Sequence, residues 1–412
     1  MIFSIAWKNV WRNKLRSSIV IASMVIGLIG GIFYLAFAKG MAQQQVNSAI
    51  HSEISNIQIH NPEFLINNEI SFTINNADEK VKKIKTINGV KEAACRITSA
   101  AMASSAITGT GIFVNGIDYK EEEKVTNIST LLVSGTYFNV RYKNPIVVGE
   151  KLAEKLKVKI GSKIVITIQN IEGEIAYSAF RIAGIYKTHN SNYDLMNVFV
   201  TQQDLTNIIG INPNSATEIA VLLNHNLLTR SVSKEIKKLF SKEISQKFLV
   251  VRTWEDISPV LKMLNEMTIQ YSMIFVIIIL VALSFGIINT MLMAIMERVR
   301  EIGMLMAIGM SKVKVFFMIT LETVFLSITG GVLGLSISWI LVEIMGISGI
   351  DLSSIADGLN SMGYSSYVYP ELDLIYYGLI GLLVVVTAIF ASIMPARKAL
   401  KFNPAQAVRH DA

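Results

Sequence analysis

The chain has 412 residues, of which 51% are hydrophobic and only 17% are charged, and its mean hydropathy is +0.46. Soluble domains usually carry about 25% charged residues, so this is not the composition of an ordinary soluble protein. The formal net charge is +7 and the pI is about 9.2. The sequence has no basic stripe with interleaved aromatic residues, so this positive charge does not indicate a nucleic-acid-binding protein. The single cysteine, Cys95, excludes an intramolecular disulfide.

The N-terminus combines basic and aromatic residues. Residues 1–16 contain Lys8, Arg12, Lys14 and Arg16 and no acidic residue, together with Trp7 and Trp11. This combination is typical of a helix that lies at a membrane surface. Residues 1–16 are therefore predicted to form an amphipathic N-terminal segment.

Four long apolar runs are predicted to be transmembrane helices. Each reaches the roughly 20 residues that an α-helix needs to cross a hydrocarbon core about 30 Å thick. The runs are residues 17–38, 267–296, 315–342 and 374–394. The first run could instead be a cleaved signal peptide, but it is longer than the roughly 7–15 residues of a signal h-region. An uncleaved helix is favoured.

Basic residues predict the orientation. Lys and Arg cluster in residues 1–16, 297–314 and 395–412, which four membrane crossings place on the same side. Because positive loops face the cytoplasm, these segments and both termini are predicted to be cytoplasmic. The large insertion at residues 39–266 and the smaller loop at 343–373 then lie outside.

Residues 39–266 are predicted to form an α+β domain. The expected fold is thus four transmembrane helices with a large α+β extracytoplasmic domain inserted between helices 1 and 2. Ile- and Val-rich runs indicate strands, and amphipathic stretches indicate helices. Strands are expected near residues 54–59, 89–94, 112–117, 146–148, 164–168, 180–186, 197–200, 218–223 and 248–251, and helices at 77–85, 150–156, 202–209 and 228–240.

The sequence contains no recognisable catalytic or metal-binding pattern. Its histidines are scattered without the spacing of metal ligands: His51, His60, His189, His225 and His410. HExxH, GxSxG and P-loop motifs are absent, and no pattern pairs the carboxylates, so a hydrolase in the outer domain is disfavoured. Cys95 lies in an Ala- and Ser-rich stretch, which favours a packed small residue over a reactive thiol.

The segment between the second and third apolar runs, residues 297–314, is the most informative part of the chain. It begins with charged residues, continues as a glycine-bounded amphipathic stretch, and ends with Lys312 and Lys314. A charge run is ordinarily a solvated loop, and glycine is ordinarily helix punctuation. Here the combination favours a helix on the cytoplasmic membrane surface that contacts a soluble partner. The energy that drives the protein is therefore predicted to come from another protein that binds this helix.

Several motifs together resemble the FtsX-type permeases of MacB-like and Lol-type ABC transporters, including the LolC/LolE-like permeases. They are residues 297–303 (ERVREIG), 307–309 (AIG), Glu322, the glycines 330, 331 and 334, and the tail segments 395–399 (PARKA) and 403–409 (NPAQAVR). Residues 6–16, 148–153, 161–163, 183–185, 193–194 and 253–254 are also similar to this family, so the resemblance covers nearly the whole chain. One departure is Met306, where the family often has a basic residue.

The resemblance implies an organisation and a set of partners. The outer domain is expected to contain a porter-like part, at about residues 50–145 and 215–255, and a sabre-like part at about 146–214. Two copies of a separate ABC ATPase subunit, which would bind ATP and Mg, and a second permease chain, identical or different, are expected. A periplasmic carrier or adaptor protein and membrane lipid are further expected partners, and the bacterial inner membrane is the expected location. The chain itself is expected to be neither an enzyme nor a cofactor-binding protein.

The same resemblance implies site residues. A coupling helix against the ATPase is expected to use Glu297, Arg298, Arg300, Glu301, Gly303, Met306, Ala307 and Gly309. Gly330, Gly331 and Gly334 are expected to allow close helix packing. Glu322 is expected to face other helices, water or a basic partner, because a lone carboxylate in an apolar run is costly. Proton coupling at Glu322 is disfavoured, since ATP supplies the energy in this family.

The resemblance predicts a mechanotransmission permease that moves its outer domain without passing substrate through the bilayer. Within the family, the chain looks most like the lipoprotein-releasing permeases, which pass lipoproteins to a periplasmic carrier. The alternatives are a MacB-like efflux permease for peptides, drugs or toxins, and a regulator of a cell-wall hydrolase. A receptor without a transport role also stays open. Neighbouring genes for a carrier, for an adaptor with a channel, or for a hydrolase would discriminate the first three.

Overall fold

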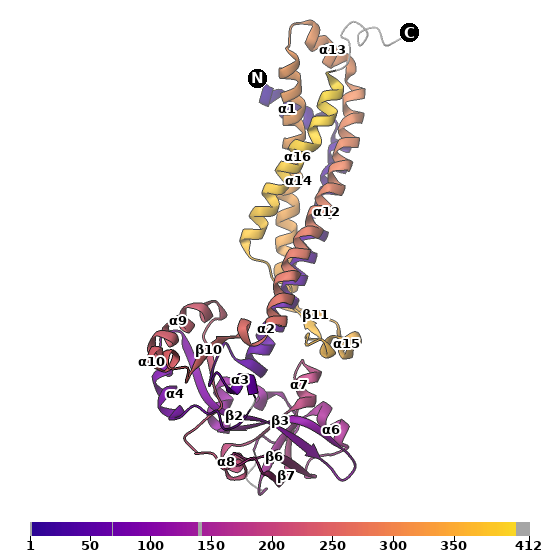
Figure 1. Cartoon of the computed structure of the whole chain (residues 1–412). Helices are drawn as coiled ribbons and strands as arrows, with labels where there is room; N and C mark the ends of the chain where they lie inside the picture. Colours follow the sequence, from indigo (N-terminus) through magenta and orange to yellow (C-terminus); the bar gives the residue numbers. More distant parts are fainter. Residues whose placement is uncertain (1, 68, 139–141, 401–412) are drawn as a thin grey trace. The chain divides into compact units, whose positions relative to one another are not determined.

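A computed structural model describes residues 2–67, 69–138 and 142–400. The chain divides into two compact units. The helical unit comprises residues 1–42, 265–351 and 367–412, and the α/β unit comprises residues 43–264 and 352–366. Many elements of both are labelled in Figure 1. The tail signature expected at residues 403–409 lies outside the described residues.

The helical unit consists mainly of long helices. They are α1 (Ile2–Arg12), α2 (Lys14–Ala49), α12 (Pro259–Glu297), α13 (Val299–Ala307), α14 (Lys312–Ser348) and α16 (Leu374–Ala399). Within the described part of the chain, four helical segments are long and apolar enough to cross a membrane: Lys14–Ile54, Pro259–Glu297, Lys312–Ser348 and Leu374–Ala399. The four predicted helices are therefore confirmed, although each is longer than its apolar run. The first continues through the polar residues 39–49 because no proline interrupts them.

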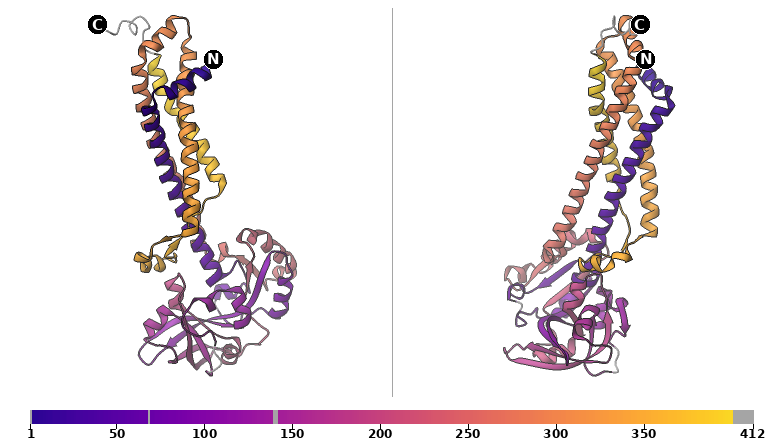
Figure 2. Two further views of the ribbon diagram at one scale, coloured as in Figure 1. Left: turned by 180° about the vertical axis from the view of Figure 1, so that it is seen from behind. Right: turned by 90° about the vertical axis from the view of Figure 1, so that its right-hand side faces the viewer.

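Close packing of α14 against α2 and α16 depends on glycine. A Cβ added at Gly334 would lie 2.8 Å from Cδ1 of Leu28, and one at Gly330 would lie 3.2 Å from Sδ of Met24. A Cβ at Gly331 would lie 3.3 Å from Cγ1 of Val384. Glycine thus lets neighbouring helices approach closely, and α14 and α16 lie side by side in Figure 2. A short antiparallel pair, β11 (Ile350–Asp351) and β12 (Tyr367–Val368), connects the ends of the loop before α16.

The α/β unit contains a ten-stranded mixed sheet. Its strands are β1 (Ile57–His60), β2 (Val90–Ser104), β3 (Gly109–Ile117), β4 (Leu132–Gly135), β5 (Pro145–Gly149), β6 (Lys163–Gln169), β7 (Ile175–Tyr186), β8 (Asn197–Thr201), β9 (Glu218–Leu223) and β10 (Val250–Thr253). Their order is β10-β1-β9-β2-β3-β8-β5-β7-β4, and β6 pairs with β2 and β7. The α+β class predicted for the insertion is confirmed.

The α/β unit also contains short helices, several of which pack on the sheet. They are α3 (Phe64–Asn67), α4 (Ala77–Lys85), α5 (Tyr119–Val125), α6 (Glu150–Leu156), α7 (Ser191–Met196), α8 (Gln202–Ile209), α9 (Thr229–Leu239), α10 (Ser241–Ser245), α11 (Trp254–Ile257) and α15 (Ala356–Ser361). The sequence predicted α4, α6 and α8 at their observed bounds. The strand predicted at residues 54–59 begins only at Ile57, because the π-helix η1 (Ile50–Ile54) extends α2 and ends at Ser55, which has φ +57°.

The two largest hydrophobic clusters among the described residues of the α/β unit lie along the sheet. One contains residues of β1, β9, β10, α4 and α9, and the other contains residues of β5–β8, α6 and α8. Ile97, Ile112 and Val114, on β2 and β3, belong to the second core. The sequence-based division at residue 146 assigns these positions to the porter-like part. The long strand β2 therefore contributes to both cores, with Ala93 in the first and Ile97 in the second, and both cores lie on one continuous sheet.

A buried ion cluster links the sheet to the end of α2. Arg96 on β2 donates to Glu122 of α5 at 2.8 Å and to Glu218 of β9 at 2.8 Å. Its Nη1 also donates to the carbonyl of Glu53 in η1 at 3.4 Å. Burial by itself lowers the pKa of Arg96, but the two carboxylates outweigh burial and raise it. Arg96 therefore stays charged and holds three elements together.

Candidate functional site

The segment between α12 and α14 forms a short helix bounded by two breaks. Arg298, between α12 and α13, has φ −113° and ψ 17°, which interrupts the helical path. After α13, Gly309 has φ +103°, and its N–H donates to the carbonyl of Met306 at 3.1 Å. A side chain at that φ would be strained, so Gly309 is required by the turn that reverses the chain into α14.

The helix α13 is amphipathic. Ile302 and Gly303 are buried against the rest of the helical unit, and Met306 packs against its core. The opposite face carries Met304, which is 49% exposed, and Ile308, just beyond the helix, which is 86% exposed. Apolar side chains this exposed at the end of a membrane bundle, four residues apart, form a small face available to another molecule.

Two of the charged residues expected to contact a partner, Glu297 and Arg298, form ion pairs within the chain. Arg298 is buried, and its Nη1 donates to Glu322 of α14 at 3.0 Å while its Nη2 donates to the carbonyl of Asn9 at 3.1 Å. Glu297 pairs with Arg16 of α2 at 2.9 Å. This side of α13 is thereby tied to α1, α2 and α14.

A further ion pair links α13 directly to the N-terminal helix. Glu301 accepts from Arg12 of α1 at 2.8 Å, and both side chains are about half exposed, at 47% and 49%. Exposed pairs of this kind contribute only about 0–1 kcal/mol. Removing one partner of a buried pair such as Arg298–Glu322 costs about 3–5 kcal/mol. The buried pair is therefore the strong element of this network.

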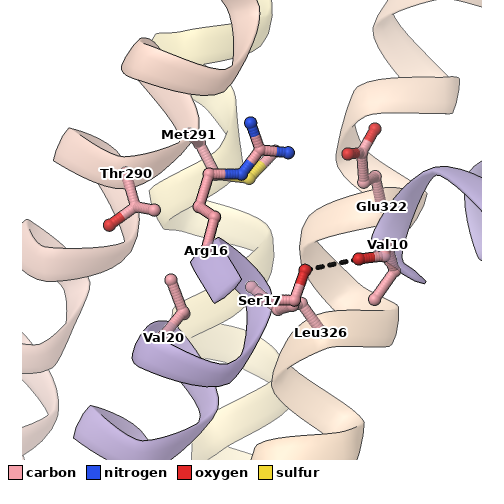
Figure 3. Close-up of a pocket in the computed structure, with 8 residues that line it drawn as sticks. All are labelled: Val10, Arg16, Ser17, Val20, Thr290, Met291, Glu322 and Leu326. Atoms are coloured by element: carbon pink, nitrogen blue, oxygen red, sulfur yellow. Dashed lines mark hydrogen bonds between the residues drawn. The ribbon is translucent and has the colours of Figure 1, made fainter. Parts of the chain in front are cut away.

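Figure 3 shows the interior of the network. Glu322 of α14 and Arg16 of α2 line a cavity together with Met291 of α12, and Ser17 Oγ donates to the carbonyl of Val10. The cavity measures about 10 Å³, which is at the lower limit for a single water molecule. It is a packing gap and not a site for a substrate.

A second cavity lies beside the same carboxylate. It measures about 90 Å³ and is lined by residues of α1, α12, α13 and α14, among them Ile5, Asn9, Arg298 and Glu322. Three waters would fill it, since a water occupies about 30 Å³. The network therefore has room for solvent but not for a ligand of substrate size.

The N-terminal helix α1 packs against α14. Ala6 and Val10 are buried, and the ring of Trp7 lies 5.6 Å from that of Phe325 in an edge-to-face arrangement. Trp11 lies 6.0 Å from Trp7 and is 42% exposed. The predicted amphipathic segment is thus a helix that packs one face on the bundle (Figure 2) and leaves both tryptophans partly exposed.

The structure separates the eight expected coupling residues into two groups. Arg298, Gly303 and Met306 face the helical unit, whereas five are exposed: Glu297, Arg300, Glu301, Ala307 and Gly309. The structure adds Met304 and Ile308 to this candidate surface. Their spacing of four residues is visible in the sequence and places both on one face of a helix.

The described residues contain no group of three or more His, Cys, Asp or Glu side chains that could hold a metal ion. Cys95 is partly buried, and its Sγ lies 3.7 Å from Oδ1 of Asp78. Burial, together with the negative charge of Asp78, raises the pKa of the Cys95 thiol to about 12. Cys95 is therefore a poor nucleophile at neutral pH.

The chain has the architecture of a multi-pass membrane protein with a large inserted domain. Four helices are long enough to cross a membrane, the α/β unit follows the first of these helices, and an amphipathic helix lies between the second and the third. Two protein families match these parts: residues 17–239 match the MacB-like periplasmic core domain, and residues 273–404 match the FtsX-like permease C-terminal domain. The chain belongs to the MacB-like and FtsX-like family of ABC transporter permeases.

Individual relatives cover nearly the whole chain. An uncharacterized ABC transporter permease of Methanocaldococcus jannaschii is 24% identical, over 99% of this chain and 97% of that protein. The lipoprotein-releasing system transmembrane protein LolC of Neisseria meningitidis is 23% identical, over 97% of this chain and 96% of its own length. The macrolide export ATP-binding/permease protein MacB of Escherichia coli is 22% identical over 97% of this chain, which spans only 59% of that relative.

Among solved structures, the extracellular domain of the noncanonic ABC-type transporter YknZ from Gram-positive bacteria is similar to part of this chain. The match has 18% identity and a TM-score of 0.35, and it covers 48% of this chain and 100% of that domain.

Proposed function

We propose that this permease is driven by separate ATPase subunits that dock on the exposed face of α13, and that it releases lipoproteins from the inner membrane towards a periplasmic carrier. The exposed apolar pair Met304 and Ile308 is the observation that carries the docking part. An ATPase surface would bury this pair, and about 25 cal/mol is gained for each Å² of apolar surface removed from water.

The arrangement supports transmission of motion through the chain. Arg298 is fixed by Glu322 and by the carbonyl of Asn9, so a displacement of α13 would be passed to α1 and α14. The exposed pair of Glu301 with Arg12 would orient α13 but contribute little stability, and Glu297 would be held by the largely buried Arg16. In this proposal α13 and both termini face the cytoplasm, and two permease chains and two ATPases form the working assembly.

The cargo proposal is supported by architecture. LolC matches this chain over almost its full length, whereas MacB is an ATP-binding/permease protein of which the chain spans about three fifths. The second candidate is efflux by a MacB-like mechanism. It is favoured by the match of residues 17–239 to the MacB-like periplasmic core domain.

The test combines docking with release. The purified chain, the ATPase encoded beside it and a labelled lipoprotein are reconstituted in proteoliposomes with the candidate carrier. Ile308→Asp should abolish co-purification of the ATPase and ATP-dependent release, because it places a charge in the apolar contact. Leu227→Asp, at an apolar position that is 95% exposed in the α/β unit, is the matched control and should leave both unchanged.

The outcomes separate the two parts of the proposal. Full co-purification of the ATPase with Ile308→Asp would refute docking on α13. ATPase docking and hydrolysis without lipoprotein release would refute the cargo assignment and favour efflux.

A further inference from the structure

The α/β unit contains a cavity of about 210 Å³ that has no role in the proposed docking of the ATPase or release of lipoprotein. It lies where the end of α2, η1, the residue before α7, the start of α12 and the loop after α15 come together. Six apolar residues form much of its wall: Ala49, Ile54, Val260, Leu261, Leu264 and Met362. Its volume would hold about seven water molecules, or one small organic molecule.

A carboxylate lies in the wall of this cavity. Glu53, on η1, lines it together with Gln45, Asn190 and Ser258. Nδ2 of Asn190 donates to Oε2 of Glu53 at 3.2 Å. Oδ1 of Asn190 is occupied at the N-terminus of α7, where it accepts from the backbone N–H groups of Asn192 and Tyr193. The amide of Asn190 is therefore fixed with its donor group towards Glu53.

The carboxylate of Glu53 has no cationic partner among the described residues. The nearby guanidinium of Arg96 donates to the backbone carbonyl of Glu53, and its charge is paired with Glu122 and Glu218. Asp194, on α7, adds further negative charge close to Glu53. One amide hydrogen bond compensates only part of the desolvation of a carboxylate, so the site is electrostatically suited to a cation.

The rest of the wall suits an apolar body. Val260, Leu261 and Leu264 lie on the first turns of α12 and face the cavity with Met362. Nε2 of Gln45 donates to the carbonyl of Met362 at 2.9 Å, which holds the loop after α15 in place as one wall. A charged end and an apolar side are thus fixed in one cavity.

We propose that this cavity binds a primary ammonium group carried on a short apolar chain. The ammonium donates to the Glu53 carboxylate and to Oγ of Ser258, since an ammonium has three donors and no acceptor. The apolar chain lies against the side chains of α12 and Met362. Such a group can come from the headgroup of an amine-bearing phospholipid or from a soluble amphiphilic amine. This binding is independent of the ATPase and of the cargo proposed above.

The first experiment is calorimetric titration of the full chain, in nanodiscs of phosphatidylcholine, with n-hexylammonium. We expect saturable binding that Glu53→Gln weakens about tenfold or more, because a charge-assisted hydrogen bond is lost while the shape is kept. Ser258→Ala should weaken binding several-fold. Glu63→Gln, at an exposed carboxylate outside the cavity, is the matched control and should bind as the unmodified chain does.

n-Hexanol tests the need for charge, because it has the same apolar chain and no ammonium. It should bind much more weakly than hexylammonium and should be insensitive to Glu53→Gln. Equal binding of the amine and the alcohol, equal binding to the unmodified chain and Glu53→Gln, or no saturable binding at millimolar concentration would each overturn the proposal. Thermal unfolding of each variant verifies that it is folded.

The two sources of the ammonium are separated by lipid composition. If the ligand is a lipid headgroup, nanodiscs containing phosphatidylethanolamine should compete with hexylammonium and weaken its apparent binding. The Glu53→Gln variant should show no such competition. If only soluble amines enter, the two lipid compositions should give the same affinity in the unmodified chain. Both results keep the ammonium site and identify its source.

Discussion

The buried pair of Arg298 and Glu322 makes a quantitative prediction about the stability of the helical unit. Arg298 donates to both carboxylate oxygens of Glu322, at 3.0 and 3.4 Å, and to the carbonyl of Asn9 at 3.1 Å. The two side chains are only 9% and 8% exposed. Glu322→Leu leaves the guanidinium buried with a single carbonyl acceptor, which should cost about 3–5 kcal/mol.

The double variant Arg298→Met with Glu322→Leu should behave differently from either single variant. Replacing both members of a buried pair by apolar residues of similar volume is often neutral or stabilising, by about 1–4 kcal/mol. The double variant is therefore expected to be at least as stable as the unmodified chain. The effects of the single variants should not add, because the two residues contact each other.

Thermal unfolding of the purified full chain in detergent, followed by circular dichroism, measures these effects. A loss of 3–5 kcal/mol corresponds to a fall of about 6–20 °C in the midpoint for a unit of 150–250 residues. Glu301→Ala, which breaks the exposed pair with Arg12, is the control and should cost about 0–1 kcal/mol. A Glu322→Leu midpoint no lower than that of Glu301→Ala, or a double variant as unstable as the sum of the singles, would refute the reasoning.

Three further predictions concern packing and titration. Gly334→Val should destabilise the helical unit by about 1–3 kcal/mol through its clash with Leu28. Gly378→Ala is the control, because an added Cβ there meets nothing within 4 Å, and it should change the thermal midpoint by far less. Equal effects of the two variants would contradict the packing argument. Burial raises the pKa of Asp194 to about 6 from its ordinary 3.8, so the folded state holds this proton more tightly. The free energy of unfolding should therefore fall by about 2 kcal/mol as the pH rises from 4 to 6. Asp194→Asn should remove that part of the pH dependence, and an unchanged slope would contradict the assignment. The thiol of Cys95, with its pKa raised to about 12, should react with iodoacetamide at pH 7.5 at least about 100-fold more slowly than a free cysteine, and a comparable rate would show that it is exposed as a thiolate.

The sequence predicted the long elements well because their signals are local. An apolar run of 20 residues and an amphipathic stretch such as residues 150–156 each contain the period that identifies them. Short elements carry too few residues for a period, so α5 (Tyr119–Val125) and β4 (Leu132–Gly135) were not predicted. The division of the α/β unit was less predictable for another reason. The register that pairs Ser104 with Gly109 and Met102 with Thr167 places β2 in two cores, and register is not visible in one sequence.

The sequence predicted the helix α13 but not the intrachain contacts of its neighbouring charged residues. The charged residues 297–301 identify this segment in the sequence, and the resemblance to the permease family implies that they contact an ATPase. Arg298 turns inward because Glu322 lies 24 residues further along, at a matching height on α14. Only the packing of α14 against α12 and α13 shows which arginine meets that carboxylate. The cost of a carboxylate in an apolar run led to the expectation that Glu322 faces other helices, water or a basic partner, and the structure shows the basic partner to be Arg298.

The division of roles within α13 follows from the energetics of the two kinds of contact. A charged contact with a soluble partner would be screened, since the Debye length is about 8 Å at physiological ionic strength, and an exposed pair contributes about 0–1 kcal/mol. Exposed apolar side chains such as Ile308 keep their contribution in salt. In the proposed docking, the apolar contacts of α13 face the partner, and the buried ion pair holds α13 to its own bundle. Binding of the proposed ATPase should accordingly depend weakly on ionic strength, and a loss of docking between 50 mM and 500 mM salt would show that Arg300 and the other exposed charges dominate the contact.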